Sequence, residues 1–326
     1  MKRFSIYALT AVFFLFPLTA QQEPVPFRDI DMIQLASPSE GKKASYVIGD
    51  NSQSFTAVRT LDPFKMNKYE TTYALWFRTR VEAEKNGYVF SNPGQEGSAG
   101  RRGRYPTETG SLEPVTMINW YDAIVWCNAL SEAEGKTPCY TYKGKVLRDS
   151  TDTASCDLAV CDWGADGYRL PAEAEWEYAA RVMNTGFQRG DYASGQEDDT
   201  KKGDVRVRSD QFVAWSYLNT NVTRTVGTAG TLFTAEAQPA AGSGNANAAG
   251  LFDMSGNVLE FCWDWFADYT EQEKGTRATG PEYGSQRVNR GGSWSPYTSF
   301  IAAGDRYSYD PNEVYNYMGF RICSSW

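Results

Sequence analysis

The sequence contains no histidine. A Ser–His–Asp triad, a Cys–His pair, an HExxH zinc site and an iron site built from histidines and a carboxylate therefore cannot form within this chain. The cysteines include no CxxC pair, so a zinc cluster of the usual spacing is not expected either. These absences exclude much of ordinary hydrolase and oxygenase chemistry before any motif is considered.

Positive charge is also scarce. The formal net charge is −8, from 32 Lys and Arg against 40 Asp and Glu. The densest basic stretch, Arg101, Arg102 and Arg104, lies among glycines and is typical of a solvated loop rather than of a phosphate site. The composition therefore predicts no nucleic acid and no acidic membrane among the partners.

A long hydrophobic run occurs only at the N-terminus. Lys2 and Arg3 precede the apolar stretch FSIYALTAVFFLF, and the small residues of LTA at 18–20 offer a cleavage site before Gln21. The run is short for a transmembrane span, and we expect no such span elsewhere. We predict a signal peptide at 1–20 and an exported protein, in the periplasm or at the cell surface, with a buried N-terminal helix as the alternative.

The cysteines are even in number, which permits disulfides in an exported chain. Cys156 and Cys161 lie in a loop-like region and could pair with each other or with Cys139. The other three sit among large apolar residues, where buried thiols are the default: Cys127, Cys262 and Cys323. Because Cys127 is the first cysteine, the predicted leader is not followed by one that could carry a lipid.

Few segments have regular periodicity. Residues 64–70 alternate in apolar character and predict a strand, whereas 71–87, 119–135 and 167–181 have the spacing, caps and closing residues of helices. The stretches 91–111 and 136–166 predict loops, and 185–250 predicts a long irregular segment held on a core by its aromatic residues. The expected fold class is a compact α+β domain of few helices, short strands and much irregular structure.

Four stretches together resemble one family. They are PVTMINWYDAIVWC at 114–127, GYRLPAEAEWEYAAR at 167–181, GLFDMSGNVLEFCWDWF at 250–266, and the pair RVNRGGSW and GFRIC at 287–323. In order and spacing they are similar to the formylglycine-generating-enzyme (sulfatase-modifying factor) domain. The resemblance covers about residues 45–326, leaves 21–44 as an N-terminal extension, and implies a variant of the C-type lectin fold.

The resemblance also implies an activity that this sequence does not support. Enzymes of the family use two cysteines shortly after the GGS motif to handle copper and oxygen, and the corresponding positions here are Pro296 and Ile301. Without a thiolate pair neither that metal site nor that thiol chemistry is available. We therefore expect a member of the family that is not an enzyme and holds no catalytic cofactor.

A structural calcium ion is the one cofactor that the family still implies. In its enzymes the turn corresponding to GNVLE helps to bind calcium, and Asn257 and Glu260 match that turn. Oxygen ligands of this kind suit calcium. The alternative is a turn in which Asn257 and Glu260 form hydrogen bonds without any metal.

The segment 294–317 is rich in tyrosine, serine, asparagine and aspartate, between the flanks RGGSW and GFR. Tyrosine provides large, rigid contact area with a polar tip, and serine and asparagine adapt their hydrogen bonds, as in antibody paratopes. The segment therefore predicts an exposed interaction surface. The alternative is that the tyrosines line the core or a crevice of the fold.

The genetic code provides a second signal. Every residue from Ser295 to Asn312 can be reached from an asparagine codon when its adenines change freely, a set that excludes Trp, Met, Gln, Lys and Glu. The chain thereby resembles the variable proteins of diversity-generating retroelements, including treponemal ones, which display altered side chains on a C-type lectin scaffold. The predicted ligand-binding residues are Trp294, Tyr297, Ser299, Phe300, Asp305, Tyr307, Tyr309, Asp310, Tyr315 and Tyr317.

We thus predict an exported, non-catalytic protein whose diversified site binds a protein or a glycan. One alternative is an invariant member that binds a single envelope partner or glycan. Another is an enzyme with altered chemistry, in which acids such as Glu313 or Asp305 would act with tyrosines in proton transfer.

Overall fold

The structure is a computed structural model of the chain. It describes residues 27–35, 44–49, 56–183, 186–187, 192–193, 213–232, 238–269 and 279–325. The predicted signal peptide at 1–20 lies outside the described residues, as does much of the predicted extension at 21–44. Among the described residues, none of the helices is long and apolar enough to cross a membrane.

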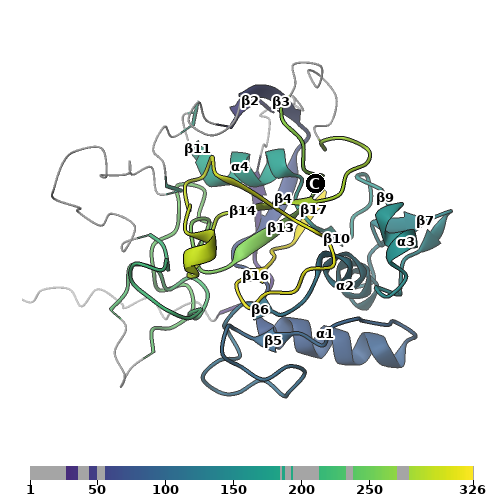
Figure 1. Cartoon of the computed structure of the whole chain (residues 1–326), viewed down its shortest axis with the longest axis horizontal. Coiled ribbons are helices and arrows are strands. Elements are labelled where there is room, and N and C mark those ends of the chain that lie inside the picture. The colour runs from purple at the N-terminus through teal and green to yellow at the C-terminus, as the bar shows by residue number, and fades with distance from the viewer. Residues whose placement is uncertain are drawn as a thin grey trace, which may run out of the picture.

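The α+β fold predicted from the sequence is confirmed: helices are few and strands are short (Figure 1). The helices are α1 (Tyr73–Lys85), α2 (Trp120–Ala133), α3 (Thr153–Asp157) and α4 (Glu173–Arg181), with a 3-10 helix η4 (Pro296–Thr298). The strands are β1 (Met32–Leu35), β2 (Ala44–Ile48), β3 (Ala57–Leu61), β4 (Phe64–Asn67), β5 (Gln95–Glu96), β6 (Val115–Thr116), β7 (Tyr140–Tyr142), β8 (Lys145–Val146), β9 (Val160–Cys161), β10 (Tyr168–Arg169), β11 (Val182–Met183), β12 (Gly186–Phe187), β13 (Leu259–Trp265), β14 (Arg287–Arg290), β15 (Arg306–Tyr309), β16 (Met318–Gly319) and β17 (Cys323–Ser325).

Two small sheets organise the domain. The first has the order β1-β4-β17-β10 and is antiparallel throughout, so the C-terminal strand β17 lies between β4 and β10. The second has the order β15-β14-β13-β16, in which only the β13–β16 pair is parallel. The strand β15 therefore forms one edge of the second sheet.

Two of the three predicted helices begin within two residues of their predicted starts, each after a residue whose side chain caps it. The Thr72 hydroxyl accepts a hydrogen bond from the Leu75 amide at 3.2 Å, and Asn119 forms a capping box with Asp122. The third helix begins later than predicted, at Glu173, because Tyr168–Arg169 pairs with β17 and Pro171 disfavours helical backbone in the residue before it. The helix α3 was missed, since five residues are too few to show a period.

The largest hydrophobic cluster joins α1 and α2 to the C-terminal strands. Trp76 and Trp126 stack with ring centroids 5.6 Å apart, and the edge of Phe320 meets both rings. The three side chains are fully buried. Figure 1 shows α1 and α2 along one side of the molecule and α4 over the central strands.

Buried ion pairs run through the centre of the domain. The three glutamates of α4, at 173, 175 and 177, are all buried and paired with arginines. Glu175 receives two hydrogen bonds from Arg169, at 2.6 and 2.8 Å, and Glu177 receives a short one from Arg290. Near them, Arg321 donates to both oxygens of Glu260, at 2.6 and 2.7 Å.

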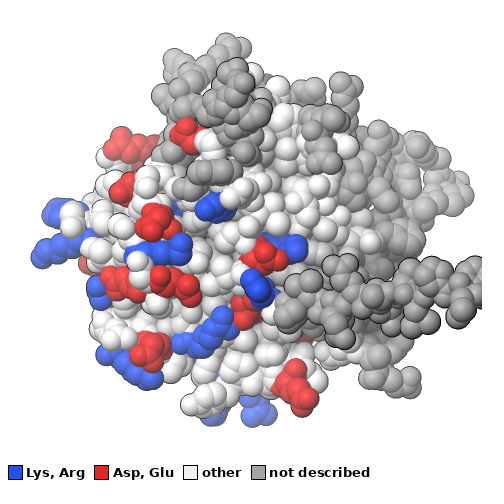
Figure 2. All heavy atoms as spheres, turned by 180° about the vertical axis from the view of Figure 1, so that it is seen from behind, with Lys and Arg blue, Asp and Glu red and all other residues white. Residues whose placement is uncertain are grey.

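All six cysteines lie in the described part of the chain. Each is buried and none forms a disulfide. The prediction of buried thiols at Cys127, Cys262 and Cys323 is confirmed, whereas the pairing considered for Cys139, Cys156 and Cys161 is not formed. On the surface, Figure 2 shows acidic and basic side chains interspersed on one face, without a patch of positive sign in that view.

The buried pairs give a direct test of the fold. We expect Glu177→Gln to lower the free energy of unfolding by about 3–5 kcal/mol, because the fully buried Arg290 would lose the nearer of its two carboxylates and keep only Glu173, 3.6 Å away. Urea unfolding followed by tryptophan fluorescence measures the change. The matched control is Glu82→Gln, which removes an exposed pair with Lys85 and should leave the urea midpoint unchanged. Equal midpoint shifts in the two variants would contradict the assignment.

Candidate ligand-binding site

The segment 294–317 follows β14, rejoins the second sheet as its edge strand β15 and ends just before β16. The turn at its start requires glycine: Gly292 has φ +64, and a Cβ there would lie 2.3 Å from the Phe300 carbonyl oxygen. The Ser293 amide donates to the Thr298 carbonyl at 2.9 Å, and the two hydroxyls form a short hydrogen bond. These contacts close the first loop of the segment, which contains η4.

Groups outside the segment hold its backbone at several points. The Asn257 carbonyl accepts from the Trp294 amide at 3.2 Å, and Arg290 donates to the Asp305 carbonyl. Three further hydrogen bonds come from outside amides, Trp120 to Pro311, Met117 to Tyr315 and Leu259 to Tyr317, at 3.2, 3.2 and 2.8 Å. These five contacts with the main chain do not depend on the side chains of the segment.

The predicted ligand-binding residues divide by exposure. Tyr297 is 80% and Phe300 58% exposed, and Asp310 is exposed. Five others are half-buried: Trp294, Ser299, Tyr307, Tyr309 and Tyr315. Together these eight residues form what we call the tyrosine surface.

Two of the predicted residues are buried in the structure. Asp305 is 6% exposed, and its carboxylate accepts from the Ala302 amide at 2.9 Å, so it shapes a turn rather than meeting a ligand. Tyr317 is 8% exposed and stacks beneath Tyr315, with ring centroids 4.8 Å apart at 8°. An acidic turn residue and an exposed acid look alike in sequence, so no local pattern indicates that Asp305 is buried.

The half-buried aromatic residues rest on the main hydrophobic cluster. The Tyr309 ring meets Tyr315 edge-on, with centroids 5.6 Å apart, and the Tyr307 hydroxyl accepts from the Phe300 amide at 2.8 Å. The exposed loop that contains η4 and the tyrosine rings of β15 therefore form one continuous surface. Glu313 was considered above only as a proton-transfer acid of an enzyme. In the structure its carboxylate accepts a hydrogen bond from the Tyr315 hydroxyl at 3.2 Å.

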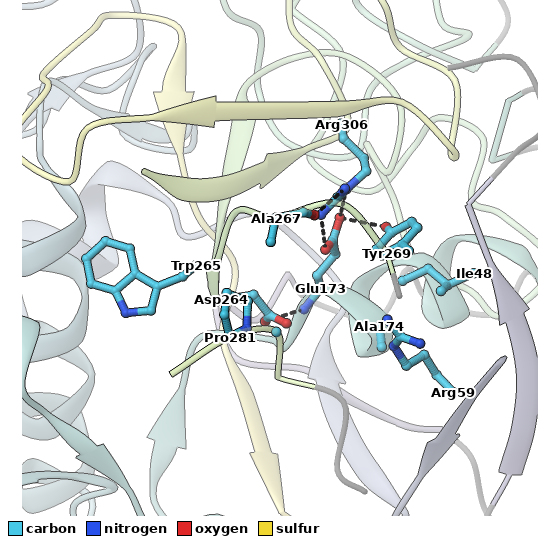
Figure 3. Close-up of a pocket in the computed structure, with 11 residues that line it drawn as sticks. Ile48, Arg59, Glu173, Ala174, Asp264, Trp265, Ala267, Tyr269, Pro281 and Arg306 are labelled. Carbon is cyan, nitrogen blue, oxygen red and sulfur yellow. Dashed lines mark hydrogen bonds and ion pairs between the residues drawn. The ribbon is translucent and has the colours of Figure 1, made fainter. Parts of the chain in front are cut away.

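The other side of β15 is tied to the core. Arg306 donates to both carboxylate oxygens of Glu173, at 2.6 and 2.8 Å, and to the Ala267 carbonyl at 2.9 Å (Figure 3). Tyr269 donates to the same carboxylate at 2.9 Å. No sequence pattern indicates this contact, because Glu173 and Arg306 lie far apart in the chain. It orients β15 so that Tyr307 and Tyr309 face the opposite way from Arg306.

Next to Glu173 lies a small cavity of about 10 Å³, room for about one water molecule. The Asp264 carboxylate lines it and accepts from the Glu173 amide at 2.8 Å. Burial and the charge of Glu173 raise the pKa of Asp264 to about 8. The cavity is too small for a ligand, and Asp264 holds a proton at neutral pH.

The residues expected to bind calcium are engaged elsewhere. The Glu260 carboxylate accepts from Arg321 and, at 2.8 Å, from the Trp176 indole. The Asn257 side chain donates to Glu70 at 2.6 Å and accepts from the Arg224 amide at 2.9 Å. Among the described residues no group of three acidic or cysteine side chains could hold a metal ion. The arrangement of these contacts does not fit calcium. The calcium site therefore remains a prediction.

Comparison with known sequences places these features in a family. The model of the sulfatase-modifying factor enzyme 1-like domain matches residues 37–325. The chaperone protein LppX of Paenibacillus barcinonensis is 28% identical over 274 residues, which are 82% of this chain and 81% of that protein. The formylglycine-generating enzyme of Mus musculus is 30% identical over 279 residues, 81% of this chain and 67% of the enzyme.

Solved structures share the fold. Variable protein 1 of Treponema denticola superposes with a TM-score of 0.65 at 26% identity, covering 90% of this chain and 95% of that one. The structure of CarF superposes with a TM-score of 0.66 at 24% identity, covering 91% and 98%. The C-type lectin-like architecture expected from the sequence is therefore confirmed.

The protonated Asp264 predicts how stability varies with pH. Its pKa is higher in the folded than in the unfolded chain, so the folded state binds the extra proton and stability falls as pH rises from about 4 to about 8, by at most about 1.4 kcal/mol per pH unit. Asp264→Asn should remove this part of the slope while its amide oxygen still accepts from Glu173. Urea midpoints between pH 4 and 9 measure the difference, and identical slopes for both proteins would contradict it.

Proposed function

The chain belongs to the sulfatase-modifying factor enzyme 1-like domain family, and from that premise we propose that it is an exported, non-catalytic protein that binds a ligand through the tyrosine surface. We further propose that this surface is diversified by a retroelement. The ligand is a protein or a glycan.

One observation carries the proposal. The backbone of 294–317 is anchored by Asn257, Arg290, Trp120, Met117 and Leu259, while Tyr297 and Phe300 extend into solvent. Such a segment can change its exposed side chains without losing the contacts that fold it. Paratopes have the same division between a fixed frame and exposed aromatic residues. The similarity to a treponemal protein named for its variability supports the same reading.

The absence of family catalysis is supported by the positions that would carry it. Pro296 lies in η4 and Ile301 is buried, and neither offers a thiol. The neighbouring cysteines in sequence, Cys262 and Cys323, are buried, and burial raises the pKa of both thiols well above the usual value. Protonated thiols inside the core are poor metal ligands and poor nucleophiles.

Diversification is tested in the gene. We expect substitutions among related isolates to concentrate in codons 294–317, with an adenine-rich near-copy beside a reverse transcriptase gene as template. Deep sequencing of the last part of the gene and its flanking DNA measures this. Within the segment, the codons of the buried Asp305 and Tyr317 should vary less than those of Tyr297 and Phe300. An unvarying segment without a template would leave a fixed site for one partner.

Binding is tested with ligands selected from a displayed peptide library. We expect Tyr297→Ala with Phe300→Ala to weaken the selected ligands at least about tenfold, because exposed aromatic side chains dominate interfaces of this kind. Surface plasmon resonance measures the affinity. Thermal melting should be unchanged, since both side chains are mostly exposed.

The matched control is Tyr105→Ala, which removes a tyrosine that is 83% exposed and packs against Phe77 of α1. Its affinity for the selected ligands should equal that of the unaltered protein. If the double variant binds normally, or if Tyr105→Ala weakens binding as much, the tyrosine surface is not the binding site.

A further inference from the structure

The tyrosine surface carries a carboxylate beside its stacked rings. Glu313 is half-buried, and its Oε1 accepts from the Tyr315 hydroxyl at 3.2 Å. Burial is the main cause that raises the pKa values of Tyr309, Tyr315 and Tyr317, and the negative charge of Glu313 raises each of them further. Of the three hydroxyl groups, that of Tyr315 lies within hydrogen-bond distance of the Glu313 carboxylate.

The segment presents only negative charge to solvent. Its charged residues are Asp305, Arg306, Asp310 and Glu313. The first two are committed within the fold, Asp305 to its turn and Arg306 to Glu173. The acids that remain, Asp310 and Glu313, accept hydrogen bonds from Asn312 and Tyr315, and neither forms an ion pair with a described basic side chain.

Two basic side chains approach this region. Arg287 is the cross-strand partner of Tyr309 but is buried against the rings of Trp120 and Trp265. Arg102 Nη2 lies 3.8 Å from Met117 Sδ, and the Met117 amide donates to the Tyr315 carbonyl. Within the described part of the chain Arg102 makes no ion pair with either acid. With a formal net charge of −8 on the whole chain, the surface is complementary to a positively charged partner.

We propose that Glu313 and the rings of Tyr309 and Tyr315 form a subsite for a guanidinium or ammonium group, so that the ligand is a polypeptide that presents arginine or lysine. An aromatic face attracts a cation, and an adjacent carboxylate adds a charge-assisted hydrogen bond. The inference rests on the proposed function, because it names the partner chemistry of the same surface.

The subsite is separate from the most exposed residues of the segment. The run of residues reachable from an asparagine codon ends at Asn312, and glutamate lies outside that set. A change confined to Tyr297 or Phe300 would leave Glu313 and the rings of Tyr309 and Tyr315 in place. Variants that keep these three residues would then keep the preference for cationic partners. A neutral glycan, which could also stack on tyrosines, gains nothing from this charge.

The test uses three labelled dodecapeptides that are identical except for four positions, occupied by Arg, Gln or Glu. Fluorescence anisotropy with the full chain measures their affinities. We expect the Arg peptide to bind at least about tenfold more tightly than the Gln peptide, and Glu313→Gln to remove most of that difference. Raised salt should weaken the Arg peptide only.

The matched control is Glu282→Gln. Glu282 also accepts from a tyrosine hydroxyl, that of the neighbouring Tyr283 at 2.9 Å, and its removal changes the net charge equally. It should leave the Arg peptide affinity within about twofold of the unaltered protein. Melting curves of both variants verify that the fold is retained.

Several outcomes overturn the subsite. Equal binding of the Arg and Gln peptides does so, and so does an equal loss in the Glu282→Gln variant, which would indicate a bulk charge effect. A captured neutral glycan whose binding ignores Glu313→Gln does so as well. Selected ligands that require Tyr297 and Phe300 but not Glu313 would refute the cation subsite while leaving the ligand-binding function intact.

Discussion

Two fully buried arginines fix the ends of the segment on which the proposed function depends. Arg290 precedes it and binds Glu177 of α4, and Arg321 follows it and binds both oxygens of Glu260 on β13. A buried charge that loses its partner is costly, so both ends of the segment have only one low-energy position. Arg290 also donates to the Asp305 carbonyl, which extends the constraint into the segment itself. The backbone that carries the tyrosine surface is therefore held in one position, whereas the side chains of the surface are held mostly by packing.

The same constraint separates folding from binding. Contacts that position the segment come from backbone groups and from residues beneath it, such as Glu173 under Arg306. The residues that meet solvent, Tyr297 and Phe300 above all, contribute little to those contacts. Substitutions in them would alter the ligand without unfolding the domain, because the free energy of folding resides elsewhere. The scaffold of a family that includes enzymes is therefore equally suited to displaying side chains.

Sequence patterns anticipated much of this arrangement. The caps at Thr72 and Asn119 are local, and a hydroxyl or amide before a periodic apolar run is sufficient to reveal them. The four motifs identified the family because their residues fold the core, and the tyrosine content of 294–317 indicated a surface. The errors have physical causes as well. Helix α4 begins after Pro171 because Tyr168 and Arg169 pair with the C-terminal strand β17. No local sequence pattern indicates a pairing between segments so far apart.

The sequence alone determined the family, the fold class and the segment that meets solvent, because local composition and motif order are sufficient for these. It could not determine which acids in that segment are exposed. Asp305 and Glu313 both lie close to tyrosines in the sequence. The Asp305 carboxylate accepts from a backbone amide in a buried turn, whereas the Glu313 carboxylate accepts from the hydroxyl of a surface tyrosine. Only the tertiary structure decided this, because burial depends on which distant residues cover a side chain. The partners of Arg290, Arg306 and Arg321 were decided in the same way, since each ion pair joins residues at least 61 positions apart.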